Sequence, residues 1–548
     1  MVVEARGTGP IAGRGRARRK ARRRRRVAVA ATTGVVAVLA GLLFATPNGV
    51  AKTSAGVVPA LGYDPADLGS VSSISQIVGA QTAWARGYTG AGVDVAVIDT
   101  GVAPVPGLDT PGKVITGPDL SFDSQQPWPQ GVDAFGHGTF MAGLIAGRDA
   151  TASGSARGCR TCLNSSGYSD TTTYVGIAPD ARIVNVKVGA ADGAADVTQV
   201  IAAIDWVTQH AHDPGLNIRV ISLSYGTDST QNSRQDPLAQ AAEQAWKHGI
   251  VVVAASGNDG KSINRAADPG YDPYLITVGA DNPKKTLSPT DDAVPGWAQH
   301  GNTNRPIDLV APGLHVIGLR VPGSFIDTLP TNTGQVGTRF QRGSGTSEAT
   351  AIVAGVTALV VQRYPGATSD QIKALLNGTA TALSSPEAIA AGQKVHWGNG
   401  LPNAGAAGST ALGSRLATMQ TATPSTGRGL LDASRGGVTV TDGTTELTGQ
   451  QDIFGQPFDA AAMAAQQTAA NAWNGGLWNG SRWTGDRWAN GTWPPATWSG
   501  TWAGGTWTGS RWRDMTWVGS RWRGSSWTGS QWTGTGWDDA HWADDTWD

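Results

Sequence analysis

The sequence predicts an α/β fold with a parallel sheet covered by helices on both faces, and two observations indicate it. Apolar runs of strand length recur along the chain, at 93–98, 183–188, 219–225 and 250–255. Helix-like stretches, such as 200–210 and 237–248, lie between them. Strands that alternate with helices favour parallel pairing, because each crossover helix returns the chain to the same end of the sheet and covers one of its faces.

A later apolar stretch, residues 350–361, is only about a dozen residues long. A helix that spans a bilayer needs about 20 apolar residues, so this stretch predicts a buried helix. Thr368 and Gln371 then form a capping-box pattern at the start of another helix, and Gly378 indicates where that helix stops.

Three short segments each place one polar residue beside glycines at the edge of an apolar run. They are 93–101 (VDVAVIDTG), 136–139 (GHGT) and 345–347 (GTS), which contain Asp99, His137 and Ser347. An orienting carboxylate, an imidazole base and a nucleophilic hydroxyl are what acyl transfer requires. Taken singly, each segment also has an ordinary structural interpretation, as a turn, a helix start or a helix cap.

The chain order Asp, His, Ser is that of subtilisin, and the chain resembles the subtilisin-like serine protease family over roughly residues 80–436. The resemblance implies that the side-chain amide of Asn258, in 254–260 (AASGNDG), is an oxyanion donor. It also implies one segment that pairs with an extended substrate and another that lines the far side of the primary pocket. These two segments are Ser224, Tyr225 and Gly226, and Ala255, Ser256 and Gly257. Finally, it makes 427–435 the closing segment of the domain and 384–426 an insertion before it.

The sequence departs from the family pattern near the motifs. Glu348 follows the nucleophile where the family usually has Met, Ala351 stands in place of a Pro, and Phe140 stands in place of a His. None of these changes removes a catalytic group. A carboxylate at Glu348 is compatible with a helix N-terminus, and it would disfavour acidic substrates if it pointed into the cleft.

The start of the chain predicts export. Residues 1–26 are strongly basic and 27–45 are an uncharged run, followed by small residues at 49–51. This pattern is typical of a secretory signal, so we expect residues 1–51 to be a leader and the protein to be secreted or on the cell surface. The uncharged run is also long enough to act as an uncleaved membrane anchor. Without the leader the chain is acidic, which argues against nucleic acid as a partner.

The remaining small features leave alternatives open. Residues 52–79 are expected to be a short linker, without room for the folded propeptide usual in the family. Cys159 and Cys162 are a candidate disulfide that closes a small loop, with a redox, zinc-binding or free-thiol role as the alternatives. The chemistry needs no cofactor. Structural calcium is common in the family, but the sequence places no ligands for it.

The end of the chain is a repeat array. After an expected linker at 437–470, Trp recurs every five residues from Trp473 to Trp547 with one four-residue step, and Gly often lies two positions after it. The glycines disfavour helix, so short extended pieces joined at turns are expected to stack into a small β-solenoid over 471–548. The Trp rings form the core of that array, or they present an adhesive face to a glycan or cell-wall polymer. Disorder of the array is the third alternative.

These observations predict an exported serine endopeptidase that acts on protein or peptide substrates. Two alternatives remain: a surface-binding protein in which the Trp repeats are the main functional part, and a processing protease of a secretion system tethered through 27–45. The sequence does not indicate the cleavage preference.

Overall fold

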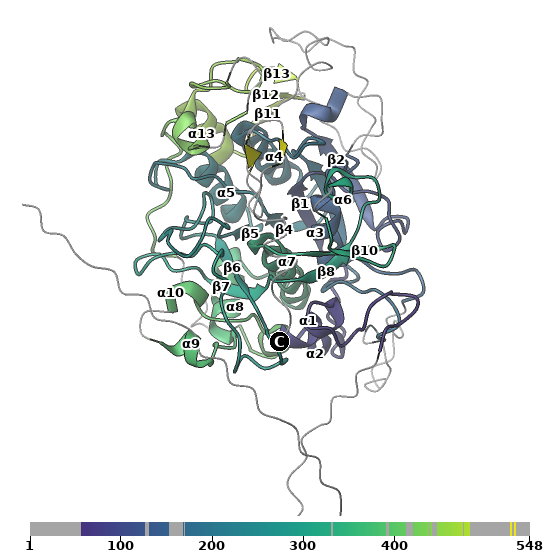
Figure 1. The fold of residues 1–548 in the computed structure, drawn as a ribbon. Coiled ribbons are helices and arrows are strands. Elements are labelled where there is room, and N and C mark those ends of the chain that lie inside the picture. Colours follow the sequence, from purple (N-terminus) through teal and green to yellow (C-terminus); the bar gives the residue numbers. More distant parts are fainter. Residues whose placement is uncertain are drawn as a thin grey trace, which may run out of the picture. The chain divides into compact units, whose positions relative to one another are not determined.

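The computed structural model describes residues 56–125, 131–152, 168, 170–329, 332–390, 394–412, 420–437, 439–440, 446–474, 476–482, 527–528 and 531–532. A seven-stranded sheet runs through its centre in the order β2-β3-β1-β4-β5-β6-β7, and all neighbouring strands are parallel (Figure 1). The strands are β1 (Asp94–Asp99), β2 (Val114–Asp119), β3 (Arg182–Lys187), β4 (Ile218–Leu223), β5 (Val251–Ala255), β6 (Ile276–Asp281) and β7 (Leu309–Pro312). The predicted α/β architecture is therefore confirmed for this part of the chain.

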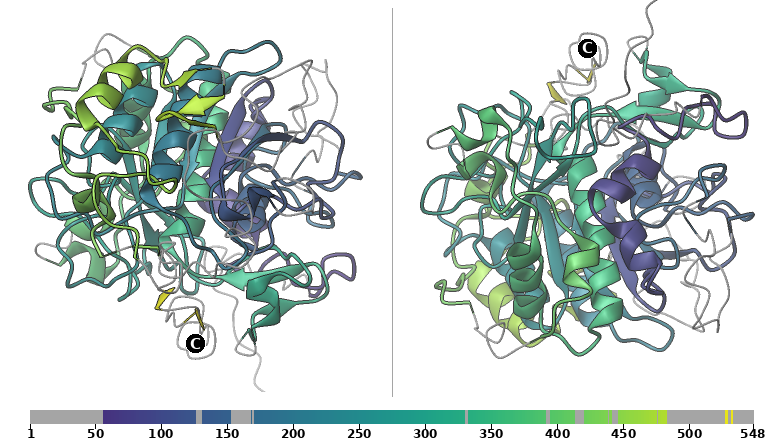
Figure 2. Two further views of the ribbon diagram at one scale, coloured as in Figure 1. Left: turned by 90° about the horizontal axis from the view of Figure 1, so that it is seen from above. Right: turned by 90° about the horizontal axis from the view of Figure 1, so that it is seen from below.

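Helices cover both faces of the sheet (Figure 2). On one face lie α4 (Val197–His210) and α5 (Pro237–Lys247), and on the other lie α3 (His137–Ala146) and α7 (Thr346–Arg363), which pack against each other. The remaining helices are α1 (Val71–Ile77), α2 (Ala80–Trp84), α6 (Phe325–Thr328), α8 (Ser369–Thr379), α9 (Pro386–Ile389), α10 (Lys394–Trp397), α11 (Ala404–Ala407), α12 (Leu431–Arg435) and α13 (Ala460–Thr468), with a 3₁₀ turn at Phe122–Gln125.

The α7 helix is the buried helix that the apolar stretch predicted, and it crosses strands β4 to β7. Its small residues allow close packing: a Cβ at Gly355 would lie 2.7 Å from the Cβ of Ile177. The α8 helix begins with the predicted capping box of Thr368 and Gln371. Within the described ranges, every helix is too short or too polar to cross a bilayer.

Among the described residues, the other strands form three small antiparallel sheets. One consists of β8 (Val316–Leu319), β9 (Gln335–Val336) and β10 (Phe340–Gly343). The other two fall in the Trp repeats: β11 (Trp473–Asn474), β12 (Leu477–Trp478) and β13 (Ser481–Arg482), and the pair β14 (Trp527–Thr528) and β15 (Gln531–Trp532). Trp473 is opposite Trp478, and Trp527 is opposite Trp532. Asn479 and Gly480, between β12 and β13, both have positive φ, as a tight type I′ hairpin turn requires. The rest of the expected solenoid lies outside the described residues.

Two segments that the sequence assigned to linkers contain packed elements. In 52–79, helix α1 buries Val71 and Ile74. In 437–470, helix α13 packs against α5 and buries Met463, and Phe454 and Phe458 before it are also buried. These apolar side chains join the core of the α/β domain. The domain boundaries therefore remain a proposal, and the contacts at both ends argue for a larger folded unit.

The first two Trp residues of the repeats are anchored on α4. The Trp473 indole donates to the carbonyl oxygen of Ala202 at 2.9 Å, and the Trp478 indole donates to Asp205 Oδ2 at 2.8 Å. Gln467 Nε2 also donates to Asp205, at 3.2 Å. Burial raises the pKa of Asp205 to about 7, although the hydrogen bonds from Trp478 and Gln467 act in the opposite direction. At the start of the array, the rings are part of a protein core.

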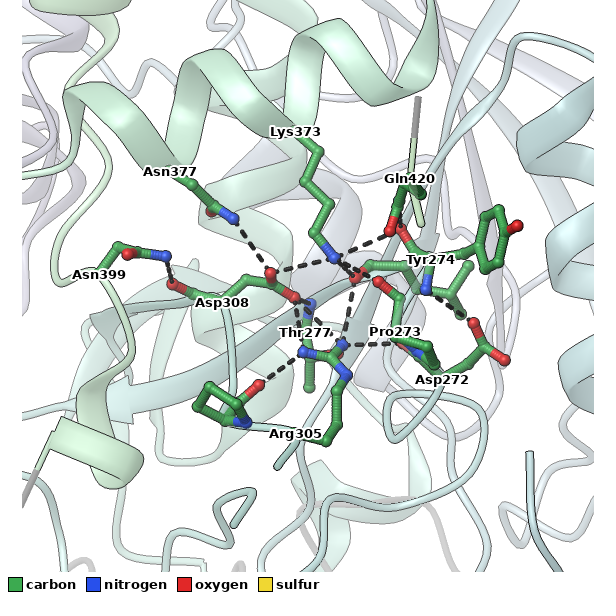
Figure 3. Close-up of polar contacts among 12 residues, drawn as sticks. Asp272, Pro273, Tyr274, Thr277, Arg305, Asp308, Lys373, Asn377, Asn399 and Gln420 are labelled. Atoms are coloured by element: carbon green, nitrogen blue, oxygen red, sulfur yellow. Dashed lines mark hydrogen bonds and ion pairs between the residues drawn. The ribbon is translucent and has the colours of Figure 1, made fainter. Parts of the chain in front are cut away.

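A cluster of charges, buried at Asp308 and Lys373 and partly buried at Arg305, holds the loop before β6 against β7 and α8 (Figure 3). Asp308 accepts from Lys373 Nζ at 3.0 Å and from Arg305 Nη1 at 3.2 Å. Burial would raise the pKa of Asp308, but the charges of Lys373 and Arg305 outweigh it and hold that pKa below its usual value.

Both cations, Lys373 and Arg305, also bind carbonyl oxygens of the loop. Arg305 Nη2 donates to those of Asp272 (2.8 Å), Gly270 (3.2 Å) and Leu275 (3.3 Å), and Lys373 Nζ to those of Leu275 (2.6 Å), Pro273 (2.8 Å) and Tyr274 (3.4 Å).

Candidate active site

Asp99 and His137 meet at the carboxyl end of strand β1. Asp99 is the last residue of β1 and His137 the first of α3. The Nδ1 atom of His137 lies 2.8 Å from Asp99 Oδ1 and 3.0 Å from Oδ2, and both side chains are buried. A carboxylate in this place fixes the tautomer of the imidazole and stabilises its protonated form.

The glycine after His137 permits this close approach. A Cβ at Gly138 would lie 2.2 Å from the carbonyl oxygen of Gly101 and 3.1 Å from Asp99 Oδ1. A larger residue would push the start of α3 away from the end of β1. The GHGT motif is therefore needed for packing as well as for chemistry.

Asp133, which lies in none of the three sequence motifs, fixes the start of α3. Its Oδ1 accepts from the backbone N–H of Gly136 at 2.7 Å and from the Thr100 hydroxyl at 2.8 Å. Its Oδ2 accepts from the backbone N–H of Thr139 at 2.8 Å and from the Thr139 hydroxyl at 2.7 Å. Since Thr100 follows Asp99 directly, one buried carboxylate ties the end of β1 to the helix that carries His137.

Ser347 is the second residue of α7, and Asn258 lies in the loop after β5. The Asn258 side-chain oxygen accepts from the backbone N–H of Thr346 at 3.0 Å. This bond fixes which end of the amide faces α7. The Asn258 Nδ2 group is buried and has no hydrogen-bond partner. A buried amide donor without a partner is costly, which is the state expected of a group reserved for a ligand oxygen.

The two segments assigned to substrate binding both contact the start of α7. The Ser224 hydroxyl donates to the carbonyl oxygen of Ser347 at 3.3 Å. The Gly257 N–H donates to the Thr346 hydroxyl at 3.2 Å. Tyr225 is fully buried, so its side chain belongs to the core and only its backbone is suited to substrate pairing. Ser256 is held by a hydrogen bond from its hydroxyl to the carbonyl oxygen of Gln299.

Three carboxyl groups act on the pKa of His137. Burial lowers the pKa of His137, but the carboxylates of Asp99, Glu348 and Asp133 outweigh it, so the net shift is upward. Burial raises the pKa of Glu348 to about 7, with His137 acting to lower it and Asp99 to raise it. Glu348 departs from the family pattern, but nothing in the sequence around it indicates that it is buried.

The described residues do not test the candidate disulfide and provide no ligands for structural calcium. Cys159 and Cys162 lie outside the described residues. Over the described ranges, no group of three or more His, Cys, Asp or Glu side chains is arranged to hold a metal ion, so calcium ligands remain unassigned.

Residues 90–401 match the model of the family described as the subtilase family. This chain belongs to the subtilase family. It is 38% identical to the serine protease AprX of Bacillus subtilis (strain 168), over 53% of this chain and 62% of AprX. It is 31% identical to subtilisin DY of Bacillus licheniformis, over 60% of this chain and 96% of subtilisin DY. A solved structure, a cold adapted subtilisin-like serine proteinase, matches with a TM-score of 0.39 and 27% identity, over 57% of this chain and 88% of that chain.

As a subtilase, the chain is a subtilisin-like serine endopeptidase whose substrates are proteins or peptides. The recognition made from the three motifs is thereby confirmed. Members of the family need no cofactor for the catalytic chemistry.

Proposed function

We propose that this subtilase cleaves peptide bonds with Ser347 as nucleophile, His137 as general base and acid, and Asp99 as the carboxylate that orients His137. Ser347 Oγ attacks the substrate carbonyl while its proton passes to His137, which later gives it to the leaving amine. The observation that carries the proposal is the buried bond between His137 Nδ1 and Asp99, at 2.8 Å, at the start of a helix that packs against α7, whose second residue is Ser347.

The tetrahedral oxyanion would be held by two donors. One is Asn258 Nδ2, which is buried and unpartnered while its oxygen is engaged by Thr346. The other is the backbone N–H of Ser347, at the positive end of the α7 dipole. The extended substrate would pair with the backbone at 224–226, opposite a wall formed by 255–257. Such pairing depends on hydrogen bonds to the main chain of the substrate more than on its sequence.

A serine-directed fluorophosphonate tests the assignment. The probe should label Ser347 in the full chain, and Ser347→Ala should lose both labelling and peptide hydrolysis. Thr350→Ala is a matched control, because Thr350 is a buried hydroxyl of the same helix that bonds to the carbonyl oxygen of Thr346. Labelling at another serine, or hydrolysis by Ser347→Ala, would disprove the triad.

We also propose that the protein is exported, on the strength of the basic block and the uncharged run in residues 1–45. The N-terminal sequence of the protein recovered from culture medium and from membranes would distinguish a cleaved signal from an anchor. An intact N-terminus in the membrane fraction would favour the tethered processing protease.

The proposed binding to a cell wall or glycan applies to the Trp repeats after residue 482. Apart from the strand pair β14 and β15, these repeats lie outside the described residues. Trp473 and Trp478 are buried on α4 and are poor candidates for ligand contact. The useful comparison is therefore Ser347→Ala full-length protein against the same protein truncated after residue 482. Equal retention of both on cell-wall material would refute this role.

A further inference from the structure

Glu348 is a buried carboxylic acid that directly follows the nucleophile. It lies in the first turn of α7 and is only 1% exposed. Its Oε1 atom is buried and has no hydrogen-bond partner. Buried carboxylates are normally paired or fully hydrogen-bonded, since desolvating them is costly. A helix N-terminus favours a negative charge here, but it does not explain why one oxygen is left without a donor.

The charged groups that act most on Glu348 are those of the catalytic pair, His137 on α3 and Asp99 at the end of β1. His137 in turn is influenced by Asp99, Glu348 and Asp133. Among the described residues, no Lys or Arg forms an ion pair with Glu348. The helix that begins at His137, α3, packs against α7, which carries Glu348 in its first turn. The imidazolium of His137 is therefore the positive charge that this packing offers to Glu348.

That imidazolium forms during the reaction. When Ser347 attacks, its Oγ–H bond breaks, the proton passes to His137, and the ring becomes positive until it releases the proton to the leaving amine. Burial raises the pKa of Glu348 to about 7, so above that pH its negative charge is already in place. Because water does not screen this charge, it stabilises the transient imidazolium without reorganisation.

We propose that Glu348 acts on catalysis through His137, as a second carboxylate that stabilises the imidazolium formed when Ser347 gives up its proton. Glu348 is thus a positioning residue: it stabilises the charge on His137 and does not touch the reacting atoms. The inference rests on the proposed triad and adds a residue to it.

The two groups then titrate together. Loss of the proton from Glu348 raises the pKa of His137, so His137 holds its own proton more tightly as the pH rises. Two groups coupled in this way lose their protons over a wider pH range than one group would. The acid limb of kcat/KM, where His137 must become neutral to act as a base, should accordingly be shallow.

Glu348→Gln tests the proposal because it keeps the shape of the side chain and removes its charge. We expect the midpoint of the acid limb to move down by about one pH unit, the shift that a neighbouring charge usually causes. The limb should also steepen to that of a single ionisation. Above the limb, the rate should fall by up to about tenfold per pKa unit of imidazolium stabilisation lost.

The profiles should be measured for the wild-type chain, Glu348→Gln, Glu348→Met and Asp205→Asn. Met is an uncharged side chain of similar length, and it serves as the second variant if Gln folds poorly. Asp205→Asn is the matched control, because Asp205 is also a buried carboxyl whose pKa is near 7 but lies on α4, on the other face of the sheet. It should leave the limb where it is.

A second measurement does not depend on turnover. In a Ser347→Ala background, the titration of the His137 ring protons by NMR should shift to lower pH when Glu348 is replaced by Gln. An unmoved titration, or a loss of rate that is uniform across pH with no change in the limb, would show that Glu348 is merely structural and would overturn the inference. If Ser347→Ala itself still hydrolysed peptides, the triad would fail first, so the two failures are distinguishable.

Discussion

Asp205 should make the docking of the first Trp repeats depend on pH. It is buried on α4, where it accepts hydrogen bonds from Trp478 and Gln467, and burial raises its pKa from 3.8 to about 7. In an unfolded chain the same carboxyl would titrate near 4. Between these two values the folded protein binds a proton that the unfolded chain has lost, so the contribution to stability is fully present below about pH 4 and is lost as the pH rises to about 7.

The size of the effect follows from the shift. About three pKa units, at 1.36 kcal/mol each, give about 4 kcal/mol between pH 4 and pH 8. Asp205→Asn removes the ionisation and keeps an oxygen that accepts from the Trp478 indole. The wild type should therefore lose about 4 kcal/mol of unfolding free energy through this group from pH 4 to pH 8, and the variant should not. The difference in unfolding free energy, variant minus wild type, should rise by that amount.

The assay is denaturant unfolding across that pH range in a Ser347→Ala background, which prevents self-digestion. Because other buried acids also titrate, only the difference between the two proteins is interpreted. Asp459→Asn is the control, since Asp459 is an exposed helix cap of α13 and Asn caps equally well. Parallel pH profiles for the wild type and Asp205→Asn would refute the reasoning.

Three further predictions follow from contacts described above. Asn258→Ala should lower kcat by about 10²–10³ with little change in KM, a magnitude taken from the corresponding donor of subtilisin; an unchanged kcat in steady-state assays would remove Asn258 from the oxyanion site. Asp133→Asn should lower both the melting temperature and kcat, since the amide keeps one oxygen and two of the four hydrogen bonds lose their charged acceptor, at about 1.5–3 kcal/mol each; normal values for both in calorimetry and kinetics would contradict its role. Arg305→Met should destabilise the protein by about 3–5 kcal/mol, because Asp308 and a set of loop carbonyls lose a partner; denaturant unfolding that matches the wild type would show that Lys373 suffices.

The sequence could predict the central sheet and the catalytic pair because their signals are local. An apolar run that ends in Asp-Thr-Gly indicates a carboxylate at a strand end, and glycines around His137 indicate a crowded helix start. Asp133 has no such signal, since its four donors come from two separate segments and only the fold brings them together. Glu348 looks like an ordinary first-turn acid, and its burial depends on how α3 packs against α7.

The C-terminal part was the least predictable for the same reason. Residues 437–470 are polar and rich in Ala, which is typical of a linker, yet a few apolar side chains such as Phe454 and Phe458 are enough to fix the segment on the domain. Trp473 and Trp478 look like the other members of a regular array. Their burial is decided by acceptors on α4, at Ala202 and Asp205, that lie more than 250 residues earlier.

The guanidinium group of Arg305 occupies a ring of main-chain oxygens of the kind that hard metal ions also favour. An ion in such a ring would be in exchange with the medium, and a chelator or simple dilution could withdraw it. Here the positive group is part of a side chain of the same polypeptide, so it cannot dissociate from the loop carbonyl groups into the medium. The loop before β6 should therefore keep its conformation whether the medium is poor or rich in metal ions.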